Sequence, residues 1–187
     1  IVDITSELML STAPNQAAIA RLTAVAAPHS GAYLHTIPMS SVGTRMDDQT
    51  IRIAIAIRLG APVCAPHKCI CGATVDSTGT HGLSCRKSPG RITRHNAVNE
   101  LIARSLKTAG IPSRLEPTHL LRNDGKRPDG ITTMPWARGR VLVWDFTCPD
   151  TLAPSHMNKA VKGPGEVANE AEMKKVAKYT TLPNNNL

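Results

Sequence analysis

Four residues with zinc-binding side chains lie within seventeen positions of the chain: Cys69, Cys71, His81 and Cys85. Cysteine sulfur and histidine nitrogen form the tetrahedral ligand sets of structural zinc sites, and the metal supplies folding energy that a short loop cannot obtain from a core. The sequence therefore predicts a zinc module. Because a single residue separates Cys69 from Cys71, the upstream Cys64 and His67 are kept as alternative ligands. The competing interpretation is a set of free cysteines buried as small apolar side chains.

A second set of candidates could perform phosphodiester chemistry. Asp129 ends a turn and Asp145 lies in a strand-like segment, and two convergent carboxylates can hold Mg²⁺, which prefers oxygen ligands. Lys175 would orient the attacking water or stabilise the transition state, and Tyr179 shares its helix face four residues on. Glu100 is a candidate third carboxylate. A single aspartate is more often a turn or cap residue, so only the set predicts catalysis.

Basic residues lie between these two sets and next to the second. The first run contains no acid and leads into an expected helix N-terminus, where backbone N–H groups favour phosphate. The nucleic-acid-binding candidates are Arg86, Lys87, Arg91, Arg94, His95, Asn96, Lys126 and Arg127. A charge run alone usually indicates a solvated surface, but its position beside the zinc candidate favours DNA or RNA.

The overall charge agrees with such a partner. The chain carries 22 Lys and Arg against 14 Asp and Glu, a net charge of +8. A polyanion is therefore the expected partner, with nucleic acid first and an anionic membrane surface second. An ordinary basic soluble protein is the alternative. No stretch approaches the roughly 20 apolar residues that span a bilayer, so no membrane insertion is expected.

The five cysteines and the chain start bear on localisation. Four cysteines cluster between Cys64 and Cys85, and Cys148 stands apart. A clustered, odd number of cysteines without a signal peptide indicates metal ligands in a reducing compartment, the nucleus or cytoplasm, rather than secretion. The first residue is Ile1, which suggests a piece of a longer polypeptide.

The expected elements would position these residues in an α+β chain with three regions: a helical linker over 1–60, the zinc module over 61–90 and a mixed region over 91–187. Helices are predicted over 17–26, 46–59, 94–109 and 165–179, an extended segment over 113–121, a turn at 123–125 and a strand over 140–148. The strand is apolar on both faces, which predicts a central position in a sheet. The apolar helix over 46–59 is expected to pack against another element.

Taken in order, these motifs resemble the PD-(D/E)xK nucleases, and more closely the C-terminal region of site-specific non-LTR retrotransposon proteins and related reverse-transcriptase-derived reading frames. The resemblance covers about residues 64–180. It rests on Cys69/Cys71/His81/Cys85, Arg94-His95-Asn96, Arg127-Pro128-Asp129, Trp144-Asp145-Phe146-Thr147 and Lys175-x-x-Lys178-Tyr179. It implies a small zinc knuckle followed by a restriction-endonuclease-like α/β core, with a central mixed sheet flanked by helices.

Two departures qualify the resemblance. Thr147 stands where the lysine of the (D/E)xK motif would be, so the resemblance assigns the role of that lysine to Lys175. The family continues with another strand and helix after the Lys-Tyr motif, so the 91–187 core is expected to be truncated at its C-terminus.

The resemblance implies a Mg²⁺-dependent endonuclease, with structural Zn²⁺, that nicks target DNA for target-primed reverse transcription. The implied partners are DNA, element RNA and the reverse-transcriptase part of the same polyprotein. The alternative is a truncated, non-catalytic remnant that binds nucleic acid through its zinc module. A purely structural zinc protein explains the charge poorly.

Overall fold

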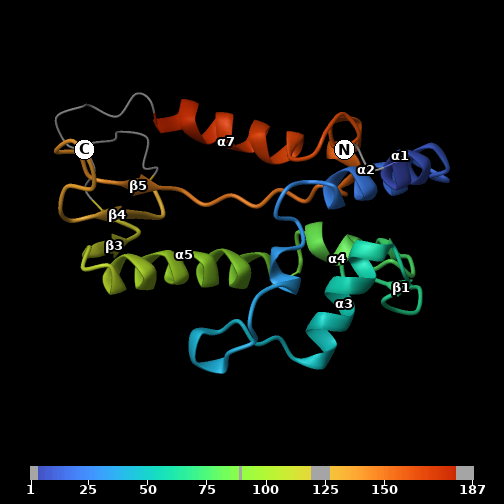
Figure 1. Cartoon of the computed structure of the whole chain (residues 1–187), viewed down its shortest axis with the longest axis horizontal. Coiled ribbons are helices and arrows are strands. Elements are labelled where there is room, and N and C mark those ends of the chain that lie inside the picture. The colour runs from blue at the N-terminus through green and yellow to red at the C-terminus, as the bar shows by residue number, and fades with distance from the viewer. Residues whose placement is uncertain (1–3, 89, 119–126, 180–187) are drawn as a thin grey trace. The chain divides into compact units, whose positions relative to one another are not determined.

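The computed structural model describes residues 4–88, 90–118 and 127–179 and confirms a mixed α+β chain (Figure 1). It divides into two compact units. The first unit comprises residues 1–88 and 149–169, and the second comprises 89–148 and 170–187. The division of the chain into regions 1–60, 61–90 and 91–187 stays a prediction.

The first unit is mainly helical. Its helices are α1 (Ile4–Ser11), α2 (Gln16–Val25), α3 (Asp48–Leu59), α4 (His81–Ser84), α6 (Met157–Ala160) and the start of α7 (Glu166–Tyr179), with 3-10 turns at Ala32–Leu34, Ser40–Val42 and Pro154–His156. A small core joins its two chain segments, because Ala20 of α2 packs with Ala160 and Val167. Leu152, Met157 and Val161 pack against these three residues.

Local capping explains where α2 and α3 begin. The side chain of Asn15 accepts a hydrogen bond from the N–H of Ala18, and that of Asp47 accepts one from Thr50. Gly60 then ends α3 in a left-handed conformation, with φ of +74°. The caps set boundaries close to those predicted for both helices.

Helix α3 is bonded to α2, since Arg21 donates to the Arg58 carbonyl, but none of its side chains is fully buried. Ile55 is 38% exposed and Leu59 is 67% exposed. The isoleucines of α3 occur at every second position, and a helix advances about 200° in two residues. They therefore fall on opposite sides, and no single face can bury them all.

A short hairpin completes the first unit. Strand β1 (His67–Lys68) pairs with β2 (Thr74–Val75) in antiparallel register, with His67 opposite Val75. Helix α4 follows after a turn at residues 76–80. The hairpin and α4 carry the Cys/His residues described below.

The second unit joins a small sheet to two helices. Helix α5 (Gly90–Thr108) precedes β3 (Ser113–Leu115), β4 (Gly130–Thr132) and β5 (Val143–Trp144), and the remainder of α7 follows. The strands are antiparallel in the order β3-β4-β5. In Figure 1 they lie between α5, next to β3, and the C-terminal part of α7.

Two details of the sheet differ from the sequence expectation. Within the described residues β5 is an edge strand only two residues long, whereas the segment 140–148 was expected to form a central strand. The central strand is β4, in which Gly130 and Thr132 are buried. The described strands are all antiparallel, whereas the resemblance implies a mixed sheet. The turn predicted at 123–125 and Lys126 lie outside the described residues.

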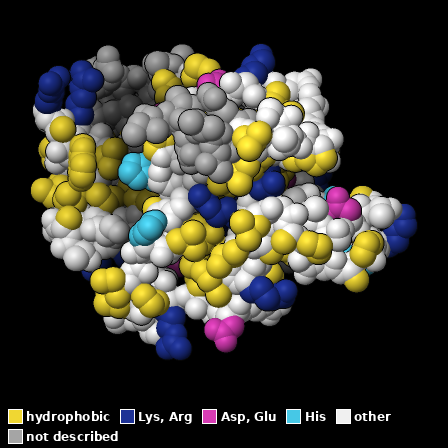
Figure 2. Space-filling view, turned by 45° about the vertical axis from the view of Figure 1, so that its right-hand side comes forward, with side chains coloured by type: hydrophobic (Ala, Val, Ile, Leu, Met, Phe, Trp, Pro, Cys, Tyr) yellow, Lys and Arg dark blue, Asp and Glu magenta, His cyan; other side chains and the backbone are white. Residues whose placement is uncertain are grey.

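The surface mixes apolar and basic side chains. Figure 2 shows hydrophobic groups interspersed with Lys and Arg on the face that it presents. Exposed apolar residues include Leu8, Ile37, Ile70, Ile92 and Trp136. No helix among the described residues has the length and apolar character needed to cross a membrane.

Candidate functional site

The Cys/His cluster consists of Cys69, Cys71, His81 and Cys85, whose ligand atoms all lie within 4.8 Å of one another. The Sγ atoms of Cys69 and Cys85 are 3.7 Å apart, and Cys71 Sγ is 3.2 Å from His81 Nε2. Zn–S bonds of about 2.3 Å at tetrahedral angles separate two sulfurs by about 3.8 Å. The four residues therefore lie close enough to bind one metal ion, consistent with zinc.

A tight turn explains the one-residue spacing of the first two ligands. Cys69 and Cys71 lie in the loop between β1 and β2, where the N–H of Gly72 donates to the Cys69 carbonyl. Gly72 has φ of +92°, a conformation that suits glycine. His81 begins α4 and Cys85 follows it, with the Cys85 N–H bonded to the His81 carbonyl. One hairpin and one helical turn thus supply two ligands each.

The electrostatics of the cluster favour a thiolate. The backbone N–H of Ala73 is the main cause that lowers the pKa of Cys71 to about 6, with further hydrogen bonds from Cys69, Cys85 and His81. Thiolate is the form of cysteine that binds metal. Cys64 lies outside the cluster, since its Sγ faces the Asp76 carbonyl at 3.4 Å.

The second candidate site surrounds Asp145, whose side chain is only 7% exposed. Lys175 Nζ donates to Oδ1, and Lys178 Nζ donates to Oδ2 at 3.1 Å. The Tyr179 hydroxyl contacts the same Oδ2 and lies 3.1 Å from the Arg127 carbonyl. One turn of α7 therefore directs three polar side chains to a single carboxylate at the end of β5.

The hydrogen bonds of this network shift the pKa values of Asp145, Lys178 and Tyr179. Burial acts to raise the pKa of Asp145, but hydrogen bonds from Lys175, Tyr179 and Lys178 outweigh it and lower the pKa below its usual value. Burial acts to lower the pKa of Lys178, but hydrogen bonds with Tyr179 and Asp145 outweigh it and raise the pKa above its usual value. Burial and the Asp145 carboxylate raise the pKa of Tyr179. Asp145 is therefore held as a carboxylate.

Asp129 is hydrogen-bonded to Trp144 and Phe146, the residues immediately before and after Asp145. The Asp129 N–H donates to the Trp144 carbonyl at 3.0 Å, and Asp129 Oδ2 accepts from the Phe146 N–H at 2.6 Å. The Asp129 side chain is 17% exposed. Its Oδ1 has no hydrogen-bond partner within the part of the chain that the structure describes. Asp129 thus has an open oxygen, whereas both oxygens of Asp145 are engaged.

Helix α5 contributes a histidine to this site. His95 Nε2 lies 3.0 Å from Asp129 Oδ2, and its ring packs against Phe146 with centroids 5.9 Å apart. His95 Nδ1 lies 3.2 Å from the side-chain nitrogen of the buried Asn99. The Trp144 indole N–H donates to Asn99 Oδ1 at 3.2 Å. The chain of contacts Trp144–Asn99–His95–Asp129 is not predictable from the sequence, because Asn99 belongs to no recognisable motif and nothing in the sequence links it to Trp144.

The other predicted residues lie apart from these contacts. Glu100 is exposed on α5, and no described hydrogen bond or ion pair joins it to Asp129 or Asp145. Arg127 forms an ion pair with Glu116, and Lys87 Nζ lies 3.3 Å from the Ile70 carbonyl. Arg94 is half-buried, whereas Arg86, Arg91 and Asn96 are exposed. Lys126 lies outside the described residues.

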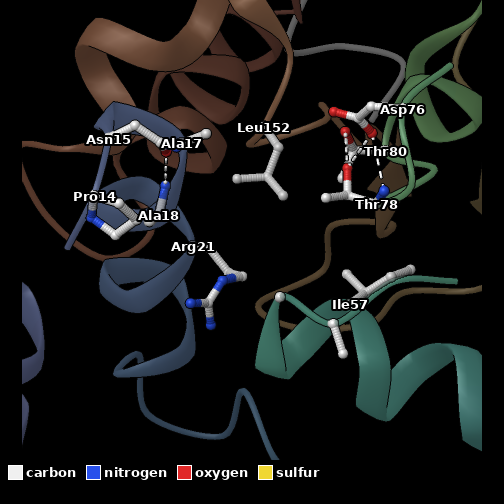
Figure 3. A pocket seen from close by; sticks show the side chains of 12 residues that line it. Pro14, Asn15, Ala17, Ala18, Arg21, Ile57, Asp76, Thr78, Thr80 and Leu152 are labelled. Atoms are coloured by element: carbon white, nitrogen blue, oxygen red, sulfur yellow. Dashed lines mark hydrogen bonds between the residues drawn. The ribbon is translucent and has the colours of Figure 1, made fainter. Parts of the chain in front are cut away.

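The first unit also contains a cavity of about 330 Å³ that no sequence motif indicated. Figure 3 shows the Leu152 side chain, from the 149–169 segment, pointing into this cavity. Arg21 of α2 and Asp76 line different walls. Arg21 donates to the Arg58 carbonyl at 2.7 Å, and Thr78 donates to the Asp76 carboxylate. The hydrogen bonds from Thr78 lower the pKa of Asp76. The cavity therefore presents a cation and an anion within partly apolar walls.

No protein-family model, curated protein or solved structure matches the chain.

Proposed function

We propose that the chain is a retroelement-derived, zinc-containing protein whose second unit is a restriction-like endonuclease that cleaves phosphodiester bonds in DNA. One observation carries the proposal. Asp129 is hydrogen-bonded to both neighbours of Asp145, and Asp145 in turn contacts Lys175 from α7. Two acids and a lysine from separate segments therefore lie near one end of the sheet, and residues of these types serve metal-assisted phosphodiester cleavage.

Carboxylate oxygens of this kind would suit Mg²⁺. The ion takes carboxylate oxygens and keeps several waters, and Asp129 Oδ1 is open toward such a ligand. Asp129 and Asp145 would hold the ion, and Asp145 would give up one of its present donors in doing so. Mg²⁺ bound there would supply charge neutralisation at the scissile phosphate and an acidified water.

The remaining side chains have separate roles. Lys175, once released from Asp145, would orient water and donate a hydrogen bond to the phosphate oxygens as charge develops on them. Lys178 and Tyr179 would continue to hold the Asp145 carboxylate. Lys178 donates to both Asp145 and Tyr179, so these hydrogen bonds to the carboxylate would remain after Lys175 moves away.

Nucleic-acid binding would use the first unit and the start of α5. A Zn²⁺ ion in the Cys/His cluster would order the hairpin and α4, immediately before the basic run that contains Arg86, Arg91 and Arg94. Exposed guanidinium groups bind phosphates without sequence preference. In the target-primed scheme, the nick would leave a 3′-hydroxyl for the reverse transcriptase of the same polyprotein, with element RNA as its template.

The alternative, a non-catalytic zinc-dependent remnant that binds nucleic acid, is favoured by a different observation. Both oxygens of Asp145 are already occupied by Lys175, Lys178 and Tyr179. A carboxylate neutralised in this way would persist as a structural ion pair after catalysis is lost, and the Cys/His cluster and basic run would still bind nucleic acid.

A plasmid assay decides between the two. Supercoiled DNA is incubated with the zinc-loaded protein and Mg²⁺, and nicked circles are quantified on gels. We expect Asp145→Asn and Lys175→Ala to lower the nicking rate by about 100-fold or more, since each removes a group that acts on the reacting phosphate. Extension of the nicked product by a DNA polymerase tests for the 3′-hydroxyl.

Lys174→Ala is the matched control. Lys174 neighbours Lys175 but is 73% exposed on the side chain and pairs with Glu170. It should leave the rate unchanged. DNA binding without nicking by a folded wild-type protein would refute the endonuclease and support the remnant.

A further inference from the structure

A donor-only group sets the direction of the hydrogen bonds that lead to Asp129. The indole N–H of Trp144 can donate but not accept, and it contacts Asn99 Oδ1 at 3.2 Å. The amide oxygen of Asn99 therefore faces Trp144, and its NH₂ group faces His95. Asn99 is buried, so its amide has little freedom to exchange these partners for water.

The Asn99 amide then selects the tautomer of His95. The Asn99 NH₂ group can only donate, and it lies 3.2 Å from His95 Nδ1. Nδ1 must therefore be the acceptor, and the proton lies on Nε2. Nε2 faces Asp129 Oδ2 at 3.0 Å and donates to it. Each hydrogen bond in the chain thus has one consistent direction.

The two groups that bond to the Asp129 side chain share one oxygen. Oδ2 accepts from His95 Nε2 and from the Phe146 N–H, and the His95 ring packs against Phe146. Oδ2 is therefore held by two groups, while Oδ1 stays open. Residues that orient a metal-binding carboxylate typically act in this way, by bonding the oxygen or lone pair that does not bind the metal.

We propose that His95, held by Asn99 and Trp144, is a positioning residue that orients the Asp129 carboxylate for a divalent cation. The inference rests on the proposed function, and it reassigns His95 from the DNA contact expected from the sequence. In this role His95 acts through Asp129 and not by contact with the phosphate.

Cation binding without DNA tests the assignment directly. Mn²⁺ is titrated into zinc-loaded protein and followed by electron paramagnetic resonance, with Asp129→Asn defining the background. We expect His95→Ala to weaken Mn²⁺ binding by about 10- to 100-fold and Asn99→Ala to weaken it less. His95→Gln should restore much of the affinity, because its amide can donate to Oδ2. Ser105→Ala, exposed on the same helix, is the control.

DNA affinity, measured in EDTA by fluorescence anisotropy, separates the two roles of His95. We expect it to be unchanged in His95→Ala. The inference is overturned if wild type binds Mn²⁺ and nicks DNA but His95→Ala binds Mn²⁺ equally well, or if His95→Ala weakens DNA binding as Arg94→Ala does.

If wild type neither binds Mn²⁺ above the Asp129→Asn background nor nicks, the proposed function fails and the inference fails with it. Unchanged circular dichroism and zinc content exclude misfolding, and recovery in His95→Gln excludes a general packing defect.

Discussion

The indole ring of Trp144 occupies the space that a side chain on Gly130 would need. The two residues are opposite each other in the β4–β5 pair, and a Cβ on Gly130 would lie 2.0 Å from Trp144 Cζ2. The absence of a side chain at residue 130 allows the indole to lie over the strand and to reach Asn99. The glycine after Asp129 thus supports the hydrogen bonds that hold the aspartate.

Replacing Gly130 by Ala should therefore destabilise the protein. A rigid ring cannot yield as a flexible side chain would, and overpacking of this kind costs about 1–3 kcal/mol. Urea denaturation measures the free energy of unfolding, and Trp fluorescence in a Trp136→Phe background reports the displaced indole. Gly82→Ala is the control, because nothing lies within 4 Å of a Cβ there. Equal stability of the two variants would contradict the packing of Trp144 on Gly130.

Loss of a ligand should remove zinc from the Cys/His cluster. Cys71→Ser and His81→Ala each leave three of the four donors, so we expect zinc content and the thiolate absorption of the Co²⁺-substituted protein to fall sharply. Chelation should lower the melting temperature of wild type for the same reason. Cys148→Ser and Cys64→Ser should retain zinc, because neither sulfur belongs to the cluster. Zinc loss in Cys64→Ser would show that the ligand set includes Cys64.

The ion pairs of Asp145 predict an acid-sensitive stability. The folded-state pKa of Asp145 lies below its unfolded value, so its contribution is present above the unfolded pKa of about 4 and is lost as pH falls through the folded pKa. The stability difference between wild type and Asp145→Asn should shrink from about pH 5 downward. Urea denaturation across this range measures it. Glu172→Gln, exposed on α7, should follow wild type, and a difference independent of pH would refute the role of ionised Asp145.

The basic run predicts a salt-dependent DNA affinity. Arg91→Ala and Arg94→Ala should each weaken binding to any duplex sequence and lower the slope of log affinity against log salt by about 0.9. Fluorescence anisotropy over a range of KCl concentrations gives the slope. Lys107→Ala, at the other end of α5, should leave it unchanged. A loss confined to one DNA sequence would instead indicate base contacts.

Features that depend on nearby residues could be predicted from the sequence. The four metal-ligand candidates lie in one hairpin and one helical turn, so their spacing alone predicted that they could meet. Helix boundaries near Asn15, Asp47 and Gly110 follow from local capping and from the left-handed glycine. These determinants act within a few residues and are visible without tertiary structure.

Features that depend on distant pairing could not be predicted. The segment around β5 is apolar on both faces, and this pattern does not distinguish a central strand from an edge strand beside other elements. The bond from Trp144 to Asn99 joins residues 45 apart in sequence and requires both Gly130 and the placement of α5. No local signal marks Asn99 as different from any other helical asparagine.

The small core of the first unit has a practical consequence for dissecting the protein. Ala20 comes from the N-terminal segment, whereas Ala160 and Val167 return to it after the whole of residues 89–148. Residues 89–148 of the second unit are therefore inserted in the sequence between the two segments of the first. A truncation after residue 88 would strip α2 of its packing partners, so a split-fragment experiment should add residues 149–169 back in trans or replace 89–148 by a short linker.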